Sequence, residues 1–262
     1  MVASSSIPAR FSAAAPTYDR HASVQHAVAE GVIGRLAGVP PPESILEVGA
    51  GTGILTEKLA LAFPSAKITA LDLSPRMVAQ CRTRLAHMPN VEFLARDIRG
   101  LATEAPFDMA ASSSSLHWIS PVDDAFRAVA ALIRPGARFT LGLMLEDTLA
   151  ELHEARHHAA PRKTVRARLP RPDDVFAALE SSGLRLLEHQ RKRFRSEFDS
   201  CSDFLRAIHE QGFTGGPVST SGVPLTRTEL KVLALHYDSH YKSPAGGVFA
   251  TYDCLLALAE RA

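Results

Sequence analysis

The most chemically informative stretch of this 262-residue chain is a glycine-rich turn, Glu47-Val-Gly49-Ala-Gly51-Thr-Gly53. It follows a short apolar run and precedes residues with helical spacing, so it should connect a strand to a helix N-terminus. Glycines let the backbone turn tightly and approach a bound ligand, and a helix N-terminus offers unpaired N–H groups. The GxGxG spacing differs from the GxGxxG pattern of dinucleotide-binding turns, which cradle a pyrophosphate. The turn is therefore expected to bind a ligand without a pyrophosphate.

Two acidic residues stand where the next two strands are expected to end. Asp72 follows the apolar run of residues 67–71, and Asp97 follows the run of residues 91–95. A carboxylate at Asp72 can accept hydrogen bonds from ribose hydroxyls, whereas Asp97 and Ile98 suit an adenine amino group and ring face. Each acid alone could be an ordinary loop residue. Together with the glycine turn, in this order, they predict a site for S-adenosylmethionine.

Glu47 lies among apolar residues, where a buried carboxylate needs a partner. Two partners are open to it: the backbone amides of the glycine turn, or the ammonium group of the cofactor. The residues expected to bind the cofactor are Glu47, Gly49, Gly51, Gly53, Asp72, Leu73, Met77, Asp97, Ile98 and Ser113.

The elements that position these residues alternate between strand and helix patterns. Apolar runs predict strands at residues 44–48, 67–71, 91–95, 107–111 and 138–143, with helical patterns between them. Residues 184–194 and 247–258 are expected to form two further strands. Such alternation is typical of βαβ units in a parallel sheet, whose ligands bind at the carboxyl ends of the strands. We expect an α/β fold: a doubly wound, mostly parallel seven-stranded sheet of the Rossmann-like class I methyltransferase type, with a helical lid.

One domain is expected over residues 1–262, with four functional parts. An N-terminal lid helix should span residues 11–38, and the cofactor-binding core residues 44–145. A basic segment follows at residues 146–172, and residues 200–242 are expected to form a helical insertion that caps the edge of the sheet.

Composition excludes several other classes of protein. The formal net charge is +1, and the three cysteines are isolated, which disfavours a disulfide framework or a zinc site. The histidines are scattered, so no metal ion is expected. No stretch approaches the roughly 18 apolar residues of a membrane span, and residues 1–10 lack the apolar region of a signal peptide. A soluble cytoplasmic protein is expected.

Motifs along nearly the whole chain resemble one family. They are the N-terminal FSAAAPTYDRHASVQ (residues 11–25), ILEVGAGTG, ALDLSPRM, SSSSLHW, LAELH and GVFATYD. Together they resemble the malonyl-acyl-carrier-protein O-methyltransferases of biotin synthesis. The central motifs are general to the methyltransferase superfamily, whereas the YDRH and LAELH stretches are more specific. The tail before Phe11 belongs to this chain alone.

The resemblance implies that the acceptor is a malonyl thioester on acyl carrier protein and that its free carboxylate is methylated. A carboxylate is already a nucleophile at pH 7, so the site must align it with the methyl group and exclude water rather than provide a strong base. Tyr18 is the first candidate to orient the acceptor, and His117 and Trp118 are expected to face it. Each of these could instead be an ordinary core residue.

A run of basic residues offers a second part of the acceptor site. Between Glu154 and Asp173 the chain has no acid but many cations. Such a run is commonly a solvated face, but one arginine could pair with the malonyl carboxylate while the others meet an acidic carrier protein. The candidates are Arg156, Arg162, Lys163, Arg166 and Arg168.

Three rival functions compete with this assignment. A methyltransferase of a small free carboxylic acid, or of another small metabolite, would keep the cofactor site without the carrier-protein surface. A nucleic-acid enzyme is disfavoured because no aromatic residues alternate with the basic ones to stack bases. A NAD-dependent dehydrogenase is disfavoured by the glycine spacing.

Overall fold

A computed structural model of the chain describes residues 6–103, 105–163, 168–213 and 223–262. Its centre is a seven-stranded sheet with the strand order β3-β2-β1-β4-β5-β7-β6. The first five strands pair in parallel, and β7 pairs antiparallel with both β5 and β6. The strands are β1 (Ser44–Val48), β2 (Lys67–Asp72), β3 (Val91–Ala95), β4 (Phe107–Ser113), β5 (Ile133–Met144), β6 (Leu184–Phe198) and β7 (Val248–Arg261).

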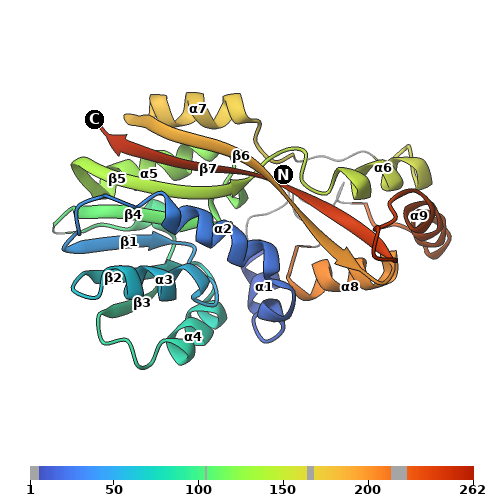
Figure 1. Ribbon diagram of the computed structural model, residues 1–262, viewed down its shortest axis with the longest axis horizontal. Helices are drawn as coiled ribbons and strands as arrows, with labels where there is room; N and C mark the ends of the chain where they lie inside the picture. Colours follow the sequence, from blue (N-terminus) through green and yellow to red (C-terminus); the bar gives the residue numbers. More distant parts are fainter. Residues whose placement is uncertain (1–5, 104, 164–167, 214–222) are drawn as a thin grey trace.

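Helices cover both faces of this sheet (Figure 1). On one face α2 (Ser23–Gly34) and α3 (Ile54–Ala62) pack through the core that contains Val28, Leu55 and Ile45. Helix α4 (Pro75–Arg84) lies beside them against β2 and β3. On the other face α5 (Val122–Leu132) and α7 (Pro172–Ser181) pack on β4, β5 and β7. The predicted doubly wound α/β sheet is therefore confirmed.

The N-terminal segment corrects the single lid helix expected at residues 11–38. It forms α1 (Ser6–Ala14), a 3-10 turn (Tyr18–His21) and then α2. The break falls at Pro16, which lacks an N–H and disfavours helical backbone in the residue before it. Helix α2 is part of the core, because Val28 and Val32 are fully buried against β5 and β7. Helix α2 is therefore an element of the core and not part of a lid.

The two longest strands extend beyond the other strands and carry a helical cap (Figure 1). Strands β6 and β7 pair from Leu184↔Arg261 to Phe198↔Val248. At the far end of this ribbon lie α8 (Cys201–Glu210) and α9 (Arg227–His240), and α6 (Ala150–Ala159) packs against α9. The LAELH and GVFATYD stretches meet here, because Glu151 accepts a hydrogen bond from the Thr251 N–H at 3.1 Å.

A buried ion pair joins the two strands of this ribbon. The side chain of Asp253 in β7 is completely buried, and both its oxygens accept hydrogen bonds from Arg191 in β6, at 2.6–3.0 Å. Arg191 also reaches Asp147 at 2.7 Å, and these carboxylates raise the pKa of its guanidinium. The bidentate pair therefore leaves no unpaired charge at Asp253.

Replacing Arg191 with methionine should lower the free energy of unfolding by about 2 kcal/mol. A fully enclosed pair loses about 3–5 kcal/mol when one partner is removed. Arg191 is 42% exposed and Arg193 lies nearby, so the loss should be smaller. Urea unfolding of the wild type and the variant measures this change in the free energy of unfolding. Arg185→Met is the control, because Glu260 keeps Arg138 as a second partner. Equal losses in the two variants would contradict the role given to Asp253.

None of the helices within the described ranges is long and apolar enough to cross a membrane. In the same part of the chain, no group of three or more histidine, cysteine or acidic side chains is arranged to hold a metal ion.

Candidate cofactor and acceptor site

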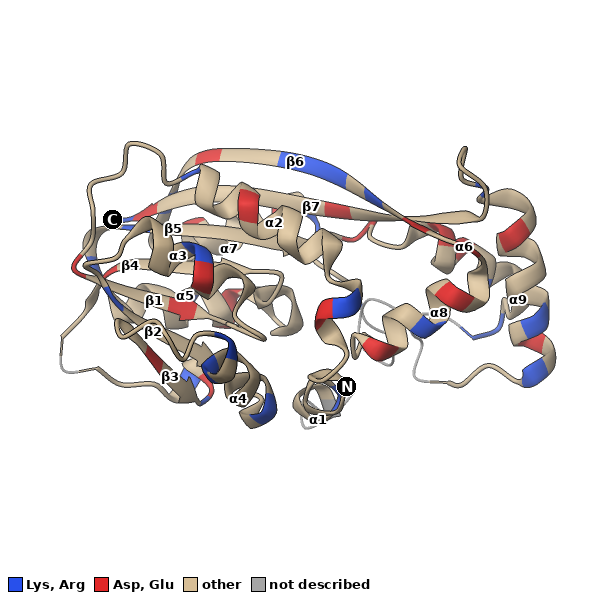
Figure 2. Ribbon diagram, turned by 60° about the horizontal axis from the view of Figure 1, so that its bottom comes forward, with Lys and Arg blue, Asp and Glu red and all other residues tan. Residues whose placement is uncertain are grey.

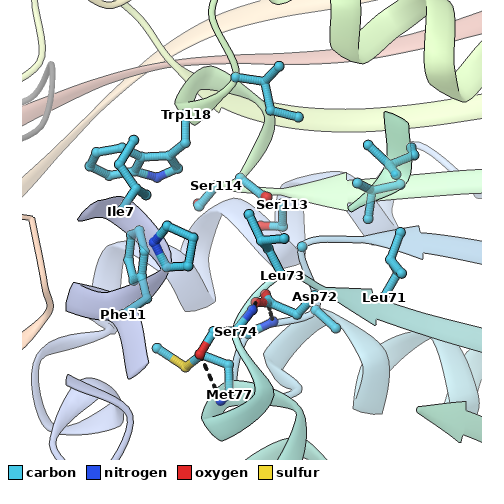
Figure 3. A pocket seen from close by; sticks show the side chains of 18 of the residues that line it. Ile7, Phe11, Leu71, Asp72, Leu73, Ser74, Met77, Ser113, Ser114 and Trp118 are labelled. Carbon is cyan, nitrogen blue, oxygen red and sulfur yellow. Dashed lines mark hydrogen bonds between the residues drawn. The ribbon is translucent and has the colours of Figure 1, made fainter. Parts of the chain in front are cut away.

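A cavity of about 1120 Å³ opens at the carboxyl ends of β1, β2 and β4 (Figure 3). The glycine turn, the end of β2 and the start of α4 form one side of it. Helix α1, the turn at Tyr18 and the segment after β4 form the other. Of the ten residues expected to bind the cofactor, nine line this cavity and Gly53 does not.

The glycine turn is held in place by its own backbone. The N–H groups of Gly49 and Ala50 donate to the Leu71 carbonyl at 2.7 and 2.9 Å, which ties the turn to β2. Gly49 has a φ of +77° and lies so close to Ser115 that a Cβ there would be 1.8 Å from its Oγ. Gly51 has a φ of +56° and open space beside it. The turn therefore presents bare backbone to the cavity.

Gly53 has a structural role rather than a ligand-facing one. It precedes α3 with a φ of +95°, and a Cβ there would lie 2.9 Å from the Cys81 Sγ in α4. Its small size thus allows α3 and α4 to pack together. The expectation that Gly53 contacts the cofactor is not supported by its position.

Asp72 joins the glycine turn to helix α4. One carboxylate oxygen accepts the Gly51 N–H at 2.9 Å, and the other accepts the Ser74 N–H at 2.8 Å. Ser74 in turn caps α4, as its side chain accepts the Met77 N–H at 3.2 Å (Figure 3). Burial raises the pKa of Asp72, although these hydrogen bonds oppose the rise. Each oxygen keeps a lone pair for a ribose hydroxyl.

Helix α1 closes over this part of the cavity. The Ser12 hydroxyl lies 2.7 Å from the Ser74 hydroxyl, so α1 is bonded to the residue that caps α4. Ile7, Pro8 and Phe11 on α1 line the cavity. Residues 7 and 8 lie in the tail to which the sequence assigns no role.

Asp97 and Ile98 lie at the end of β3, as expected, and Asp97 has an ion-pair partner that the sequence did not indicate. Ile98 is buried at the cavity, where an apolar ring can pack. Asp97 forms an ion pair with Arg99 at 2.6 Å, and this hydrogen-bonded partner lowers the pKa of Asp97. Arg99 also lines the cavity, and only the structure identifies it.

Glu47 is a buried carboxyl group with one oxygen atom left unpaired. It is 1% exposed, and burial raises its pKa to about 8. Among the described residues its Oε2 has no hydrogen-bond partner. The N–H groups of Gly49, Ala50 and Gly51 are already bonded to Leu71 and Asp72. A carboxyl group with an unpaired oxygen at this cavity fits S-adenosylmethionine, whose ammonium group is the other partner expected from the sequence.

Aromatic side chains close the acceptor side of the cavity. Trp118 packs edge-on against Phe11, with ring centroids 5.2 Å apart, and its ring centroid lies 5.8 Å from that of Phe213. Its neighbour His117 is 4% exposed, and burial lowers its pKa to about 3. Tyr18 is also buried, and burial raises the pKa of its phenol, which stays protonated. The structure thus brings Tyr18, His117 and Trp118 together at one cavity.

Several buried polar atoms without a partner lie at this cavity. Among the described residues, buried side-chain atoms without a hydrogen-bond partner include those of four cavity-lining residues: Gln25, Glu47, Ser114 and His117. Ser114 also has a φ of +54°, a strained conformation for a residue other than glycine. Since an unpaired buried polar group costs about 1–3 kcal/mol, such a set indicates a site built for a polar ligand.

The basic residues expected at the acceptor are dispersed in the structure. Arg168 is exposed and lines the cavity. Arg156 is buried in the cap, where it donates to the Val223 carbonyl at 2.9 Å. Lys163 is paired with Glu229 of α9 at 2.6 Å. Arg162 is exposed but is not among the lining residues, and Arg166 lies outside the described residues. Among the members of the set that the structure describes, Arg168 is thus the one that reaches the cavity.

Comparisons with known proteins agree with this geometry. A family model described as a methyltransferase domain matches residues 45–136. The chain is 30% identical over 260 residues to a malonyl-acyl-carrier-protein O-methyltransferase of Geobacter sulfurreducens, covering 96% of each chain. It is 28% identical over 251 residues to an enzyme of the same name from Anoxybacillus flavithermus, covering 94% of this chain and 93% of that one.

Solved structures show the same fold. The N-methyltransferase NodS of Bradyrhizobium japonicum, in complex with S-adenosyl-L-homocysteine, superimposes with a TM-score of 0.52 at 16% identity, covering 92% of this chain and 87% of that one. This likeness bears on the fold alone, whereas the likeness to the Geobacter enzyme extends over both whole chains. The chain therefore belongs to the malonyl-acyl-carrier-protein O-methyltransferases, a family of S-adenosylmethionine-dependent methyltransferases.

Proposed function

We propose that this protein transfers the methyl group of S-adenosylmethionine to the free carboxylate of a malonyl group carried as a thioester by acyl carrier protein. The observation that carries the proposal is the single cavity that joins two sets of residues. One set fits the cofactor, and the other combines the aromatic side chains of Phe11 and Trp118 with buried polar groups. Family membership identifies the acceptor class.

Each part of the cavity has a defined task in this reaction. The bound cofactor supplies an electrophilic methyl group. Glu47 and Asp72 hold the amino-acid and ribose portions, and Asp97 and Ile98 the adenine. Phe11 and Trp118 exclude water from the acceptor carboxylate, which removes the hydration that slows it. Because the carboxylate is already ionised, no residue has to take up a proton.

His117 fits this scheme because it is too weak a base to act as one. Its pKa of about 3 leaves the imidazole neutral in the physiological range, so it can donate a hydrogen bond but cannot draw a proton from an acceptor. Methylation also removes the negative charge of the acceptor. The methyl ester can then be extended by fatty-acid enzymes as an apolar chain up to pimeloyl length, which provides the biotin precursor.

The carrier protein is proposed to approach at the rim of the cavity. Arg168 lies there, and Arg162 is exposed in the same basic segment. Acyl carrier protein is acidic, so such a surface would speed encounter and make it sensitive to salt.

Mass spectrometry of malonyl-loaded carrier protein, incubated with the enzyme and S-adenosylmethionine, tests the function directly. The malonyl group should gain the mass of one methylene, and acetyl-loaded carrier should gain none. Absence of the added mass, with a protein that S-adenosylhomocysteine stabilises thermally, would reject the malonyl acceptor and favour a small free acid instead.

Changing Tyr18 to phenylalanine should slow methyl transfer and leave cofactor binding intact. The phenol is buried at the cavity and phenylalanine keeps the aromatic ring, so the substitution deletes one hydrogen-bond donor without leaving a void. The loss of one positioned donor predicts a fall in kcat of roughly 10- to 100-fold. Single-turnover rates and titration with S-adenosylhomocysteine measure the two quantities. Tyr241→Phe, in the cap, is the matched control; a loss of cofactor affinity in Tyr18→Phe alone would refute the assigned role.

A further inference from the structure

Two neutral side chains on the acceptor side end in buried donors without a partner, Gln25 and His117. The tautomer of His117 is set by the backbone. Its Nδ1 accepts the Met144 N–H at 3.3 Å, so Nδ1 carries a lone pair. In a neutral imidazole the proton is then on Nε2, and this atom has no partner among the described residues. His117 therefore holds an unused N–H donor at the cavity.

The orientation of Gln25 follows from a chain of hydrogen bonds. The Gln211 side chain donates to the His21 carbonyl at 2.8 Å, which identifies the bonded atom as Nε2. The same Nε2 lies 3.3 Å from one atom of the Gln25 amide, which must then be its oxygen. The Nε2 of Gln25 is thus the unpaired atom, and it is a donor.

One short segment at the end of α8 contacts the surroundings of both donors. Gln211 in this segment orients Gln25. Phe213, two residues later, packs on Trp118, with ring centroids 5.8 Å apart. Trp118 packs in turn on His117, with ring centroids 5.3 Å apart. This segment therefore contacts Gln25 directly and His117 through Trp118.

The cations at the cavity are in a different environment. Among the described residues that line it, Arg96, Arg99 and Arg168 are all exposed, and Arg99 is already paired with Asp97. No lysine or arginine in that set is buried. An acceptor carboxylate that enters the enclosed part thus meets uncharged donors.

We infer that Gln25 and His117 bind the free carboxylate of the acceptor thioester through two neutral N–H groups, in place of the single arginine expected from the sequence. The inference rests on the proposed function and names the residues that recognise its substrate. Neutral donors fix the orientation of a carboxylate while leaving most of its negative charge on the oxygens. An arginine would bind it more tightly but would also reduce its reactivity toward the methyl group. Gln211 is a positioning residue for Gln25.

Equilibrium binding of two carrier proteins to the full-length enzyme, with S-adenosylhomocysteine bound, tests the inference. The ratio of affinities for malonyl-loaded and acetyl-loaded carrier reports carboxylate recognition alone. Gln25→Met and His117→Leu should each lower this ratio by roughly tenfold or more. Affinity for acetyl-loaded carrier and for S-adenosylhomocysteine should not change. His117→Gln, which restores an N–H donor, should recover part of the preference for malonyl-loaded carrier.

Two further variants keep the test decisive. Gln211→Met, outside the cavity, should lower the ratio by a smaller factor, because it frees Gln25 without removing it. Arg168→Gln should weaken the binding of both loaded carriers equally and leave the ratio of the two affinities unchanged. The inference is overturned if Arg168→Gln abolishes the malonyl preference or if the Gln25 and His117 variants retain it. A wild-type enzyme that fails to methylate malonyl-loaded carrier would instead reject the proposed function, and the inference with it.

Discussion

Replacing Asp72 with alanine should weaken binding of S-adenosylmethionine by at least about 100-fold. The carboxylate is expected to accept two ribose hydroxyls, and a hydrogen bond to a charged group contributes about 1.5–3 kcal/mol. The substitution also leaves the N–H groups of Gly51 and Ser74 without their acceptor, so the glycine turn and the start of α4 lose their common anchor. Isothermal titration with S-adenosylhomocysteine measures the loss.

Two comparisons separate this effect from general damage to the fold. Asp72→Asn keeps an acceptor oxygen and should lose less affinity than Asp72→Ala. Asp173→Ala removes an exposed acid in the first turn of α7 and should bind normally. If the folded Asp72→Ala variant binds S-adenosylhomocysteine with a Kd within about threefold of the wild-type value, other residues bind the ribose.

The affinity for S-adenosylhomocysteine should rise with pH between about 5.5 and 7.5, because of Glu47. Burial raises the pKa of this carboxyl from 4.5 to about 8, so the free protein holds it protonated in this range. Binding of an ammonium group favours the ionised form and therefore releases a proton. The affinity should increase by up to about tenfold per pH unit below that pKa. In Glu47→Gln this slope should disappear, and affinity at pH 7.5 should be lower.

The same group makes the free protein less stable as the pH rises. Between pH 4.5 and about 8 the folded chain retains on Glu47 a proton that the unfolded chain has lost, so the contribution of Glu47 to the free energy of unfolding decreases across this window. Below pH 6.5 the buried, neutral His117 acts in the opposite direction, so the net decrease is expected between pH 6.5 and about 8. Glu47→Gln should remove this decrease, and urea unfolding at pH 6.5 and pH 8 checks it. A wild-type affinity that is independent of pH, with stability that still falls, would mean that Glu47 is buried without meeting the ligand.

The residues that can be identified from sequence are those whose position follows from topology. Parallel strands bring their carboxyl ends to one edge, so acids that end apolar runs, such as Asp72 and Asp97, can be assigned to that edge from the sequence alone. Ser74 and Pro75 likewise predict the start of α4, and the Ser74 hydroxyl does cap that helix.

Residues whose role depends on packing cannot be separated in this way. Glycine spacing does not distinguish close approach to a ligand, as at Gly51, from close packing of two helices, as at Gly53. Gln25 belongs to the N-terminal motif, but its burial depends on the end of α8, which lies 186 residues away in the chain. The basic run is dispersed because the chain passes from α6 to α7 there, and its members face different surroundings.

The position of β7 in the sheet determines the order in which the molecule can assemble. Strand β6 lies at the edge, and its neighbour in the sheet is β7, which comes later in the chain (Figure 1). During synthesis β6 must therefore wait, with its backbone unpaired, until residues 248–261 have left the ribosome. An unpaired strand invites pairing with other chains, and charged side chains discourage it. The lysine and arginine residues along β6 (Figure 2), two of which later pair with Asp147 and Asp253, would protect the nascent chain from aggregation before they stabilise the finished fold.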